Sequence, residues 1–406
     1  MAAVGGAIAA FVSLSALYAH LTPFGQAPDE MAHLAYVRLI AEHLELPFDV
    51  REDQQPPAYY AAGALLYRLT GSHVSLQGFS IGLGALTLLM IWLTARELWP
   101  NEPLRQASPV ALAAAIPQFQ FMSSAVSNDP LSYLSGAWLV FLMVVVWRRP
   151  PDRRRLVAIG AAMGLGLLSK ETDYVLVVVL SVVALVAWRR SLWRWDALLV
   201  PGAPALGAGW WFVRNLLAYH HPLPGLRPVG AVPLRLRHLS QARAWFDIAF
   251  RSSFAYFGNM TTPITIAGSQ DLLYRALELA LGLLGAVGLV ELSRRWPSWP
   301  GRQRAVLATL VSVVVLAALQ MVLNSVLVDY QAQGRYLYVA LSAIVIGTAC
   351  CLSAVGRYLP AGRLGVALRA VGLVVGIGAM AGVDVLGVIT VHAHLISTPL
   401  GSAPPG

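Results

Sequence analysis

Ionisable and amide residues gather at a few places in an otherwise apolar sequence, and their types suit acid–base chemistry on a phosphate-bearing substrate. Asp29 and Glu30 are adjacent, and Asn128 precedes Asp129. A carboxylate can accept the proton of an attacking hydroxyl group, which is general-base catalysis. Basic side chains can hold phosphate oxygens. The candidate site residues are Asp29, Glu30 and Asp129 for catalysis, and His33, Gln55, Asn128, Lys170, Arg214, Asn215, Arg335 and Tyr336 for substrate binding.

Both candidate aspartates also occupy positions that favour the start of a helix. Asp29 follows Pro28, and Asp129 precedes Pro130. Asp is a good N-cap residue, and Pro is favoured in the first helical turn. Capping and catalysis therefore remain open for each residue, and one does not exclude the other. We take Asp29 as the first candidate for the general base.

Lys170 and Arg335 are the candidate cations. Lys170 is the only lysine in the chain, whose other basic residues are all arginine. It could bind phosphate, or it could simply pair with a neighbouring carboxylate. Arg335 follows Gly334, which allows close approach of the backbone. Because a guanidinium group can donate two parallel hydrogen bonds, we expect Arg335 to bind phosphate.

A divalent metal is compatible with the sequence but is not required by it. Asp29, Glu30 and His33 lie within four to five residues of one another and could share a metal ion. They lack the ligand spacing of a structural zinc site, and we favour a hydrogen-bonding role for His33. The cofactor requirement stays open.

The elements that position these residues must be membrane helices. The chain is 57% hydrophobic and only 12% charged, whereas a soluble domain is about 25% charged. A span needs about 20 mainly apolar residues. We predict an all-α polytopic bundle of about eleven spans, at 3–21, 75–95, 106–124, 130–147, 156–169, 174–188, 196–216, 272–292, 305–327, 336–354 and 370–390.

Arginine placement predicts the orientation of the bundle, because short cytoplasmic loops retain positive charge. With the N-terminus inside and the C-terminus outside, all five inside loops are basic. The net charge of +9 then reflects topology and membrane lipid, and nucleic acid is not implied. The arginines placed inside are Arg96, Arg105, Arg148, Arg149, Arg153, Arg154, Arg155, Arg189, Arg190, Arg194, Arg294, Arg295, Arg302, Arg304, Arg357, Arg363 and Arg369.

Two outside segments, 22–74 and 217–271, are too long to be simple connectors. Residues 31–44 and 58–70 have roughly helical spacing of apolar residues, which predicts short helices on the membrane surface. Tyr59, Tyr60 and Tyr67 suit such an interface. The candidate site residues all fall at the outer ends of spans or in these segments. We therefore expect one domain, 1–395, with its site formed by the two segments, and a tail at 396–406.

Six short motifs in order resemble a bacterial family of polytopic membrane proteins, of formerly unknown function, within the GT-C glycosyltransferase superfamily. That superfamily includes protein O-mannosyltransferases and lipid A aminoarabinose transferases. Each motif is weak alone, and the ordered set over residues 1 to about 340 is more specific. The motifs are PDEMAHLAY at 28–36, QPPAYY at 55–60, SND at 127–129, SKETDY at 169–174, RNLLAYHHPL at 214–223 and QGRYL at 333–337.

The resemblance implies an inverting glycosyltransferase of the cytoplasmic (inner) membrane. It would move a sugar from a polyprenyl-phosphate donor to a glycan, lipid or protein acceptor at the outer, periplasmic face. The acidic pair of the first external segment would lie at the catalytic centre, and Asp129 in the same site. A secondary transporter or flippase is the alternative, although transporters favour inverted repeats and a midplane site. A non-enzymatic scaffold is a third class.

Overall fold

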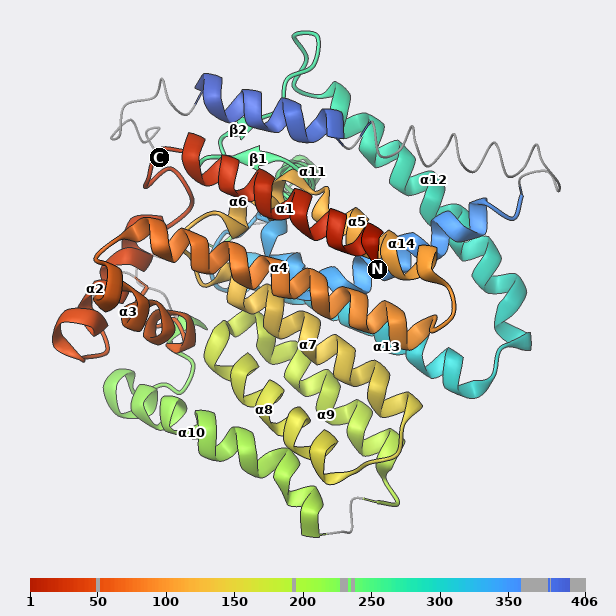
Figure 1. Cartoon of the computed structure of the whole chain (residues 1–406), viewed down its shortest axis with the longest axis horizontal. Coiled ribbons are helices and arrows are strands. Elements are labelled where there is room, and N and C mark those ends of the chain that lie inside the picture. The colour runs from red at the N-terminus through yellow and green to blue at the C-terminus, as the bar shows by residue number, and fades with distance from the viewer. Residues whose placement is uncertain are drawn as a thin grey trace.

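The computed structural model describes residues 1–48, 52–191, 195–226, 233–234, 238–358, 379 and 381–394, with only the backbone of residues 195 and 196. Long apolar helices dominate it and run roughly side by side across the view of Figure 1. In lipid, a chain must satisfy its backbone polar groups internally, and a helix does this within one segment. The predicted all-α polytopic bundle is confirmed.

Seven helical segments of the described chain are long and apolar enough to cross a membrane. Three of them include a short 3-10 turn, namely η1 (Glu171–Asp173), η4 (Trp296–Ser298) or η5 (Gly334–Ala340). Each of the seven coincides with a predicted span. Their α-helices are α1 (Ala2–Leu21), α4 (His73–Leu98), α7 (Asp129–Arg148), α9 (Tyr174–Trp188), α12 (Leu272–Arg295), α13 (Gly301–Leu327) and α14 (Leu341–Val355).

Three further predicted spans are shorter or less apolar helices, so the count of eleven is only approximate. Residues 370–378 and 380 of the last predicted span, 370–390, lie outside the described residues. The predicted span 106–124 is divided into α5 (Pro103–Ala114) and α6 (Pro117–Ser123), because Pro117 has no backbone N–H to continue a helix. Helix α8 (Arg153–Ser169) has 17 residues. Turn η2 (Trp195–Leu198) leads into α10 (Leu199–Tyr219), whose last two turns include Arg214 and Asn215. The last described helix is Ala381–His394.

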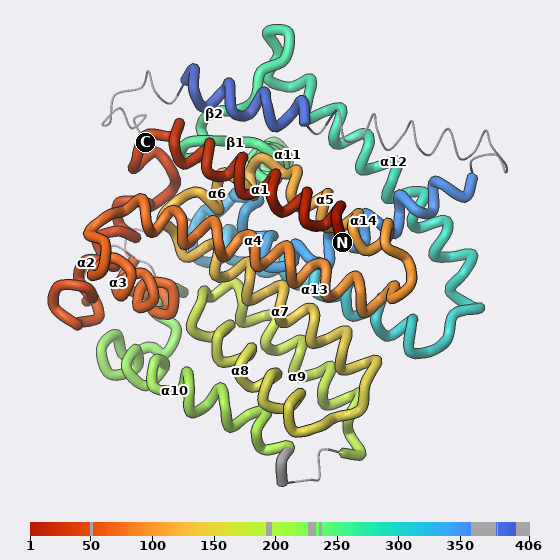
Figure 2. The backbone as a smooth tube through the Cα atoms, viewed as in Figure 1, coloured from red at the N-terminus to blue at the C-terminus, as the bar shows by residue number. Residues whose placement is uncertain are grey.

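The two predicted surface helices are present. Helix α2 (Glu30–His43) and helix α3 (Ala58–Thr70) pack against each other at one end of the bundle, beside the C-terminal end of α10 (Figure 2). The second external segment contains η3 (Pro224–Leu226) and helix α11 (Leu239–Arg251). It also contains a two-stranded antiparallel ribbon, β1 (Tyr256–Phe257) with β2 (Thr262–Pro263), which the sequence did not predict because each strand has only two residues.

Helix α7 is the central element of the bundle. In its most apolar window, 78% of the residues are buried, whereas none are buried in the corresponding window of α12. A Cβ atom on Gly136 would collide with the carbonyl oxygen of Val339, so glycine lets α7 pack directly on η5. The helix begins with Asp129. The most enclosed of the seven spanning segments therefore carries a charged candidate residue at its first position.

Asp384, for which the sequence suggested no role, joins the last described helix to α6. The Gln120 side-chain amide donates to Asp384 Oδ1 at 3.1 Å and to the Ala114 carbonyl at 2.7 Å. Asp384 is 5% exposed. The predicted tail 396–406 and the arginines Arg194, Arg363 and Arg369 lie outside the described residues.

The predicted topology can be tested by two matched Ser→Cys substitutions in a background without Cys350 and Cys351. Ser240 is exposed in α11, and Ser298 is exposed between α12 and α13. In intact cells, we expect a membrane-impermeant thiol reagent to label Ser240→Cys only. Gly225 is unsuitable for this test, because a Cβ there would collide with the Glu171 carboxylate. Equal labelling of both cysteines would overturn the orientation.

Candidate active site

Asp129 forms the centre of a buried ion-pair cluster at the end of the bundle that carries α2 and α3. Its Oδ1 accepts from Lys170 Nζ at 2.6 Å, and its Oδ2 accepts from Arg335 Nη1 at 2.9 Å. The side chain is only 2% exposed. Neither Asn128, the N-cap of α7, nor Asp129 is used as a side-chain cap. The predicted capping role is therefore not seen, and the carboxylate serves the two cations.

Arg335 is held on every side of its guanidinium group. Besides Asp129, it donates from Nε to Gln333 Oε1 at 2.6 Å and from Nη2 to the Tyr336 hydroxyl at 3.4 Å. Its Nη2 also lies 3.7 Å from Asp29 Oδ2. Its side chain is 2% exposed. The sequence suggested a fork open to phosphate, but in the structure protein acceptors occupy the fork.

Lys170 is the more accessible cation of the two. Its side chain is 11% exposed, and Nζ lies 5.2 Å from the centroid of the Tyr336 ring. The sequence left open a pair with Glu171 or Asp173; the observed pair is with Asp129. The bond to Asp129 is the one hydrogen bond of Nζ that we find among the described residues. An ammonium group has three donors, so Lys170 retains capacity for a ligand.

Asp29 is placed differently from Asp129. It is the N-cap residue of α2, but its side chain makes no capping hydrogen bond. Its backbone is left-handed, with φ 58° and ψ 10°, a conformation that is uncommon outside glycine and tends to occur at functional sites. The side chain is 24% exposed and faces Arg335. Of the two aspartates that reach Arg335, Asp29 is therefore the one with access to solvent.

Glu30 connects two loops. Its Oε2 accepts from the Gly25 backbone N–H at 2.8 Å, and its Oε1 accepts from the Val126 N–H at 3.0 Å. The residue is 2% exposed. Burial raises the pKa of Glu30, and the backbone donors lower it only in part. The carboxylate thus fixes the segment before α2 to the segment before α7.

Asn128 and Gln55 join the first external segment to the start of α7. Asn128 Nδ2 donates to Gln55 Oε1 at 3.0 Å, and the Gln55 carbonyl accepts from the Tyr36 hydroxyl at 3.3 Å. Asn128 is fully buried, and its Oδ1 has no hydrogen-bond partner among the described residues. A buried amide oxygen without a partner is costly. It is therefore an acceptor that a bound hydroxyl group could satisfy.

His33 belongs to a buried aromatic stack that sequence analysis missed. Its Nδ1 lies 2.8 Å from the Tyr60 hydroxyl, and the Tyr60 ring stacks on Tyr36 with a centroid distance of 3.8 Å. Tyr59 and Tyr60 are fully buried, not at an interface. Burial, together with Lys170, lowers the pKa of His33 to about 4. The ring is thus neutral at pH 7.

Arg214 and Asn215 contact a different part of the same external region. Arg214 Nη2 donates to the Pro47 carbonyl at 2.5 Å, and Nη1 donates to Asn215 Oδ1 at 3.0 Å. The guanidinium carbon lies 5.0 Å from the centroid of the Tyr219 ring. Arg214 therefore ties α10 to the segment between α2 and α3, and neither residue makes a described hydrogen bond with the Asp129 cluster.

Asp29, Glu30 and His33 do not form the metal site that the sequence left possible. Among the residues that the structure describes, no three His, Cys, Asp or Glu side chains form a group that could hold a metal ion. Glu30 is directed to backbone amides, and His33 is directed to Tyr60. Asp29, Glu30 and His33 are thus neighbours in sequence but do not converge on one point.

Helix α11 holds the backbone of Arg335 in place. The Gly334 N–H donates to Ser252 Oγ at 2.7 Å, and the Tyr338 hydroxyl donates to the Ser253 carbonyl at 2.7 Å. A Cβ on Gly334 would collide with Ser253 and with the Ala249 carbonyl oxygen. The close approach predicted for Gly334 is confirmed.

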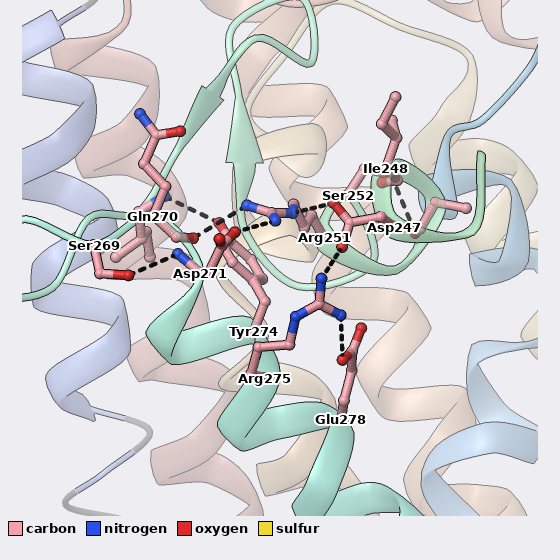
Figure 3. A network of polar contacts seen from close by, with 12 residues as sticks. Asp247, Ile248, Arg251, Ser252, Ser269, Gln270, Asp271, Tyr274, Arg275 and Glu278 are labelled. Atoms are coloured by element: carbon pink, nitrogen blue, oxygen red, sulfur yellow. Dashed lines mark hydrogen bonds and ion pairs between the residues drawn. The ribbon is translucent and has the colours of Figure 1, made fainter. Parts of the chain in front are cut away.

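A polar network in turn fixes α11 to the start of α12 (Figure 3). Arg251 pairs with Asp247 at 2.7 Å and with Asp271, and Arg275 pairs with Asp247 at 3.0 Å and with Glu278 at 2.6 Å. The hydroxyl of Tyr274 donates to the Ala255 carbonyl. Alternating charges of this kind hold two helices in one relative position. The site cation Arg335 thus depends on contacts made well outside the site.

Comparison with known proteins agrees with this fold. Residues 54–205 match the family model described as dolichyl-phosphate-mannose-protein mannosyltransferase. That segment is over a third of the chain and contains Gln55, Asn128, Asp129 and Lys170. Among curated proteins, the sequence has no significant match.

Three solved structures share the arrangement of helices. ArnT from Cupriavidus metallidurans in the apo state has a TM-score of 0.56 at 14% identity, covering 97% of this chain and 78% of that one. The archaeal oligosaccharyltransferase AglB from Archaeoglobus fulgidus, in complex with an inhibitory peptide and a dolichol-phosphate, has a TM-score of 0.55 at 13% identity, covering 95% and 56%. An Archaeoglobus fulgidus oligosaccharyltransferase in complex with Zn and sulfate has a TM-score of 0.51 at 13% identity, covering 94% and 53%.

These similarities define the fold class. The fold is that of the GT-C glycosyltransferase structures, and over a third of the chain also matches the mannosyltransferase family model. The chain spans about half the length of the two archaeal proteins that it matches.

We expect the substitution Asp129→Asn to lower the stability of the protein strongly. In Asp129→Asn, Lys170 and Arg335 would stay buried without their shared counter-charge, and breaking a buried pair costs about 3–5 kcal/mol. The control is Glu102→Gln, because the Glu102–Arg105 pair is exposed and such pairs contribute about 1 kcal/mol or less. The free energy of unfolding, measured with denaturant in detergent micelles, should separate the two variants. Equal losses would contradict the central role of Asp129.

His33 predicts a pH dependence of stability. Its folded-state pKa of about 4 lies below the unfolded value of about 6.5, so the unfolded chain binds the extra proton as the pH falls. The stabilisation is thus present above pH 6.5 and is lost towards pH 4, by up to about 3 kcal/mol. His33→Gln should remove this part of the pH dependence, and His43→Gln, at an exposed position, should not. Parallel curves for wild type and His33→Gln would contradict the assignment.

Proposed function

We propose that this protein is an inverting membrane glycosyltransferase. It moves a sugar from a polyprenyl-phosphate donor to a glycan, lipid or protein acceptor at the outer face of the cytoplasmic membrane. The observation that carries the proposal is the state of Asp29. Its carboxylate does not cap helix α2 and is partly open to solvent beside Arg335, and its backbone has a left-handed conformation.

Asp29 is the proposed general base. The acceptor hydroxyl oxygen attacks the anomeric carbon, the bond from that carbon to the phosphate oxygen breaks, and the hydroxyl proton moves to Asp29. The polyprenyl phosphate leaves with the bonding electron pair. Asp129 is a poorer base, because both of its oxygens already accept charge-assisted hydrogen bonds from buried cations. Glu30 is occupied by two backbone amides and has a positioning role.

Lys170 is the proposed contact to the leaving phosphate. Negative charge grows on that phosphate as the glycosidic bond breaks, so a fixed cation stabilises the transition state more than the ground state. Lys170 is more exposed than Arg335 and retains donor capacity. Arg335 has a positioning role instead of a contact to the phosphate, because it lies against both Asp29 and Asp129 and fixes their separation. Asn128 Oδ1, which has no hydrogen-bond partner among the described residues, is the proposed acceptor for a substrate hydroxyl group.

A lipid-linked donor fits the position of the site. Nucleotide sugars are confined to the cytoplasm, and the predicted orientation places the Asp129 cluster at the outer face. The structural relative AglB was solved with a dolichol-phosphate. The ionisable residues of the Asp129 cluster lie at one end of the bundle instead of its middle, which does not favour the transporter alternative.

The experiment is a transfer assay with purified protein and a panel of polyprenyl-phosphate sugars, measured as release of polyprenyl phosphate. Asp29→Asn should lower turnover by about 10²- to 10⁴-fold while the protein stays folded, because the variant keeps the size of the side chain and loses its basicity. The matched control is Asp152→Asn, an exposed residue that caps α8 at the opposite end of the bundle.

Three outcomes would contradict parts of the proposal. Turnover of Asp29→Asn within a few fold of wild type would show that the base lies elsewhere. Transfer from a nucleotide sugar would exclude the lipid donor. The activity itself would be overturned by two results together. The wild type would transfer sugar from no donor, and mass spectrometry would find the same glycans and glycolipids in cells after deletion of the gene.

A further inference from the structure

A large hollow lies at the opposite end of α9 from the Asp129 cluster. Its volume is about 790 Å³, and it is lined by Trp147 and by the residues Leu185 to Ser191. Ligand sites commonly have about 300–1,000 Å³. The 15 residues of α9 span about 22 Å at 1.5 Å per residue. The hollow is therefore separated from Lys170 by much of the membrane thickness.

The two arginines of this hollow differ from their neighbours in charge pairing. Arg149 Nη2 and Arg148 Nε pair with Glu97 at 2.5 and 3.4 Å. Arg189 and Arg190 are exposed, and within the described residues they form no ion pair. The hollow thus has two positive charges at its rim that the described part of the protein does not neutralise, which favours an anionic ligand.

The walls of the hollow are apolar. The indole N–H of Trp147 donates to Thr309 Oγ1 at 2.9 Å, and that of Trp188 donates to the Arg149 carbonyl at 3.1 Å. With its polar atom already paired, the partly exposed ring of Trp147 offers apolar surface, whereas Trp188 is only 4% exposed. Trp residues suit the boundary between hydrocarbon and headgroups.

An apolar path leads from the hollow along the outside of α9. Val178, Val182, Leu185 and Val186 are all more than half exposed. Their spacing of three to four residues places them on one face of the helix, and Arg189 continues the same series. This face lies towards lipid in a membrane-spanning helix, so it leads from hydrocarbon depth directly to the cationic rim.

We propose that the hollow binds an anionic glycerophospholipid of the inner leaflet. Its phosphate group lies between Arg189 and Arg190, where guanidinium groups donate paired hydrogen bonds to phosphate oxygens. Its glycerol backbone lies against Trp147, and an acyl chain follows the exposed face of α9. This site is separate from the proposed donor site and does not depend on the proposed function.

A purely local role for the arginines is the competing explanation. Cations near a helix C-terminus interact favourably with the last carbonyl groups, and Arg189 directly follows α9. In that case the arginines would stabilise the protein equally in any lipid. A test must therefore compare lipids, and not only variants.

The test measures lipid binding to purified, delipidated full-length protein by native mass spectrometry. The probes are phosphatidylglycerol, phosphatidylcholine and inorganic phosphate. The double variant Arg189→Gln/Arg190→Gln is compared with Arg153→Gln/Arg154→Gln, which removes two exposed arginines from the same end of the bundle but away from the hollow. Thermal unfolding of each protein, with and without lipid, verifies that it is folded.

We expect the wild type to retain one phosphatidylglycerol more tightly than phosphatidylcholine. The Arg189→Gln/Arg190→Gln variant should bind phosphatidylglycerol about 30-fold more weakly, and the Arg153→Gln/Arg154→Gln control within about two-fold of wild type. Equal binding of the two lipids, equal losses in the two double variants, or displacement of the lipid by millimolar phosphate would overturn the proposal. A loss of thermal stability in Arg189→Gln/Arg190→Gln that is the same in both lipids would support the local role instead.

Discussion

The pairing of buried charges around Asp129 is the constraint on which this end of the structure depends. A charged group is costly at membrane depth unless a partner compensates it. Asp129 at the start of α7, Lys170 after α8 and Arg335 in η5 are far apart in sequence, yet each is buried and each needs the others. Because the three side chains must meet in one geometry, the cluster fixes the end of α8 and η5 relative to the central helix α7.

The same cluster gives different environments to two carboxylates that look equivalent in the sequence. Asp129 is enclosed and fully engaged by two cations. Asp29 has a longer contact with Arg335 and keeps part of its surface in solvent. One acid therefore maintains the architecture, and the other is available for proton transfer. Helix α11 and its ion-pair network support this division from outside, because they hold Gly334 and with it the guanidinium group that lies between the two acids.

The bundle is polarised between its two ends. One end concentrates buried charge, amides and the aromatic stack of His33, Tyr60 and Tyr36. The other end concentrates exposed arginines and tryptophans around an open hollow. The opposite ends of a single helix, α9, therefore face different chemical environments. The proposed donor site and the proposed phospholipid site each use the part of the membrane in which their ligand lies.

Much of the fold followed from local pattern. Apolar length predicted the long helices, helical spacing predicted α2 and α3 almost to the residue, and Gly334 was correctly expected at a close approach. Local pattern was insufficient where a partner distant in sequence decides the burial or the pairing of a side chain. It joined α5 and α6 into one span, it placed Tyr59 and Tyr60 at an interface instead of in the core, and it left both aspartates as possible caps.

What the sequence by itself determined was which residues could do chemistry and which segments had to enter the membrane, because both depend on residue type and spacing. Only the tertiary structure decided which charges meet. It gave Asp129 both cations, filled the fork of Arg335 with protein acceptors and turned Glu30 onto backbone amides. The reason is physical: a buried charge or hydrogen-bonding group is satisfied by whichever group the packing of distant helices brings to it.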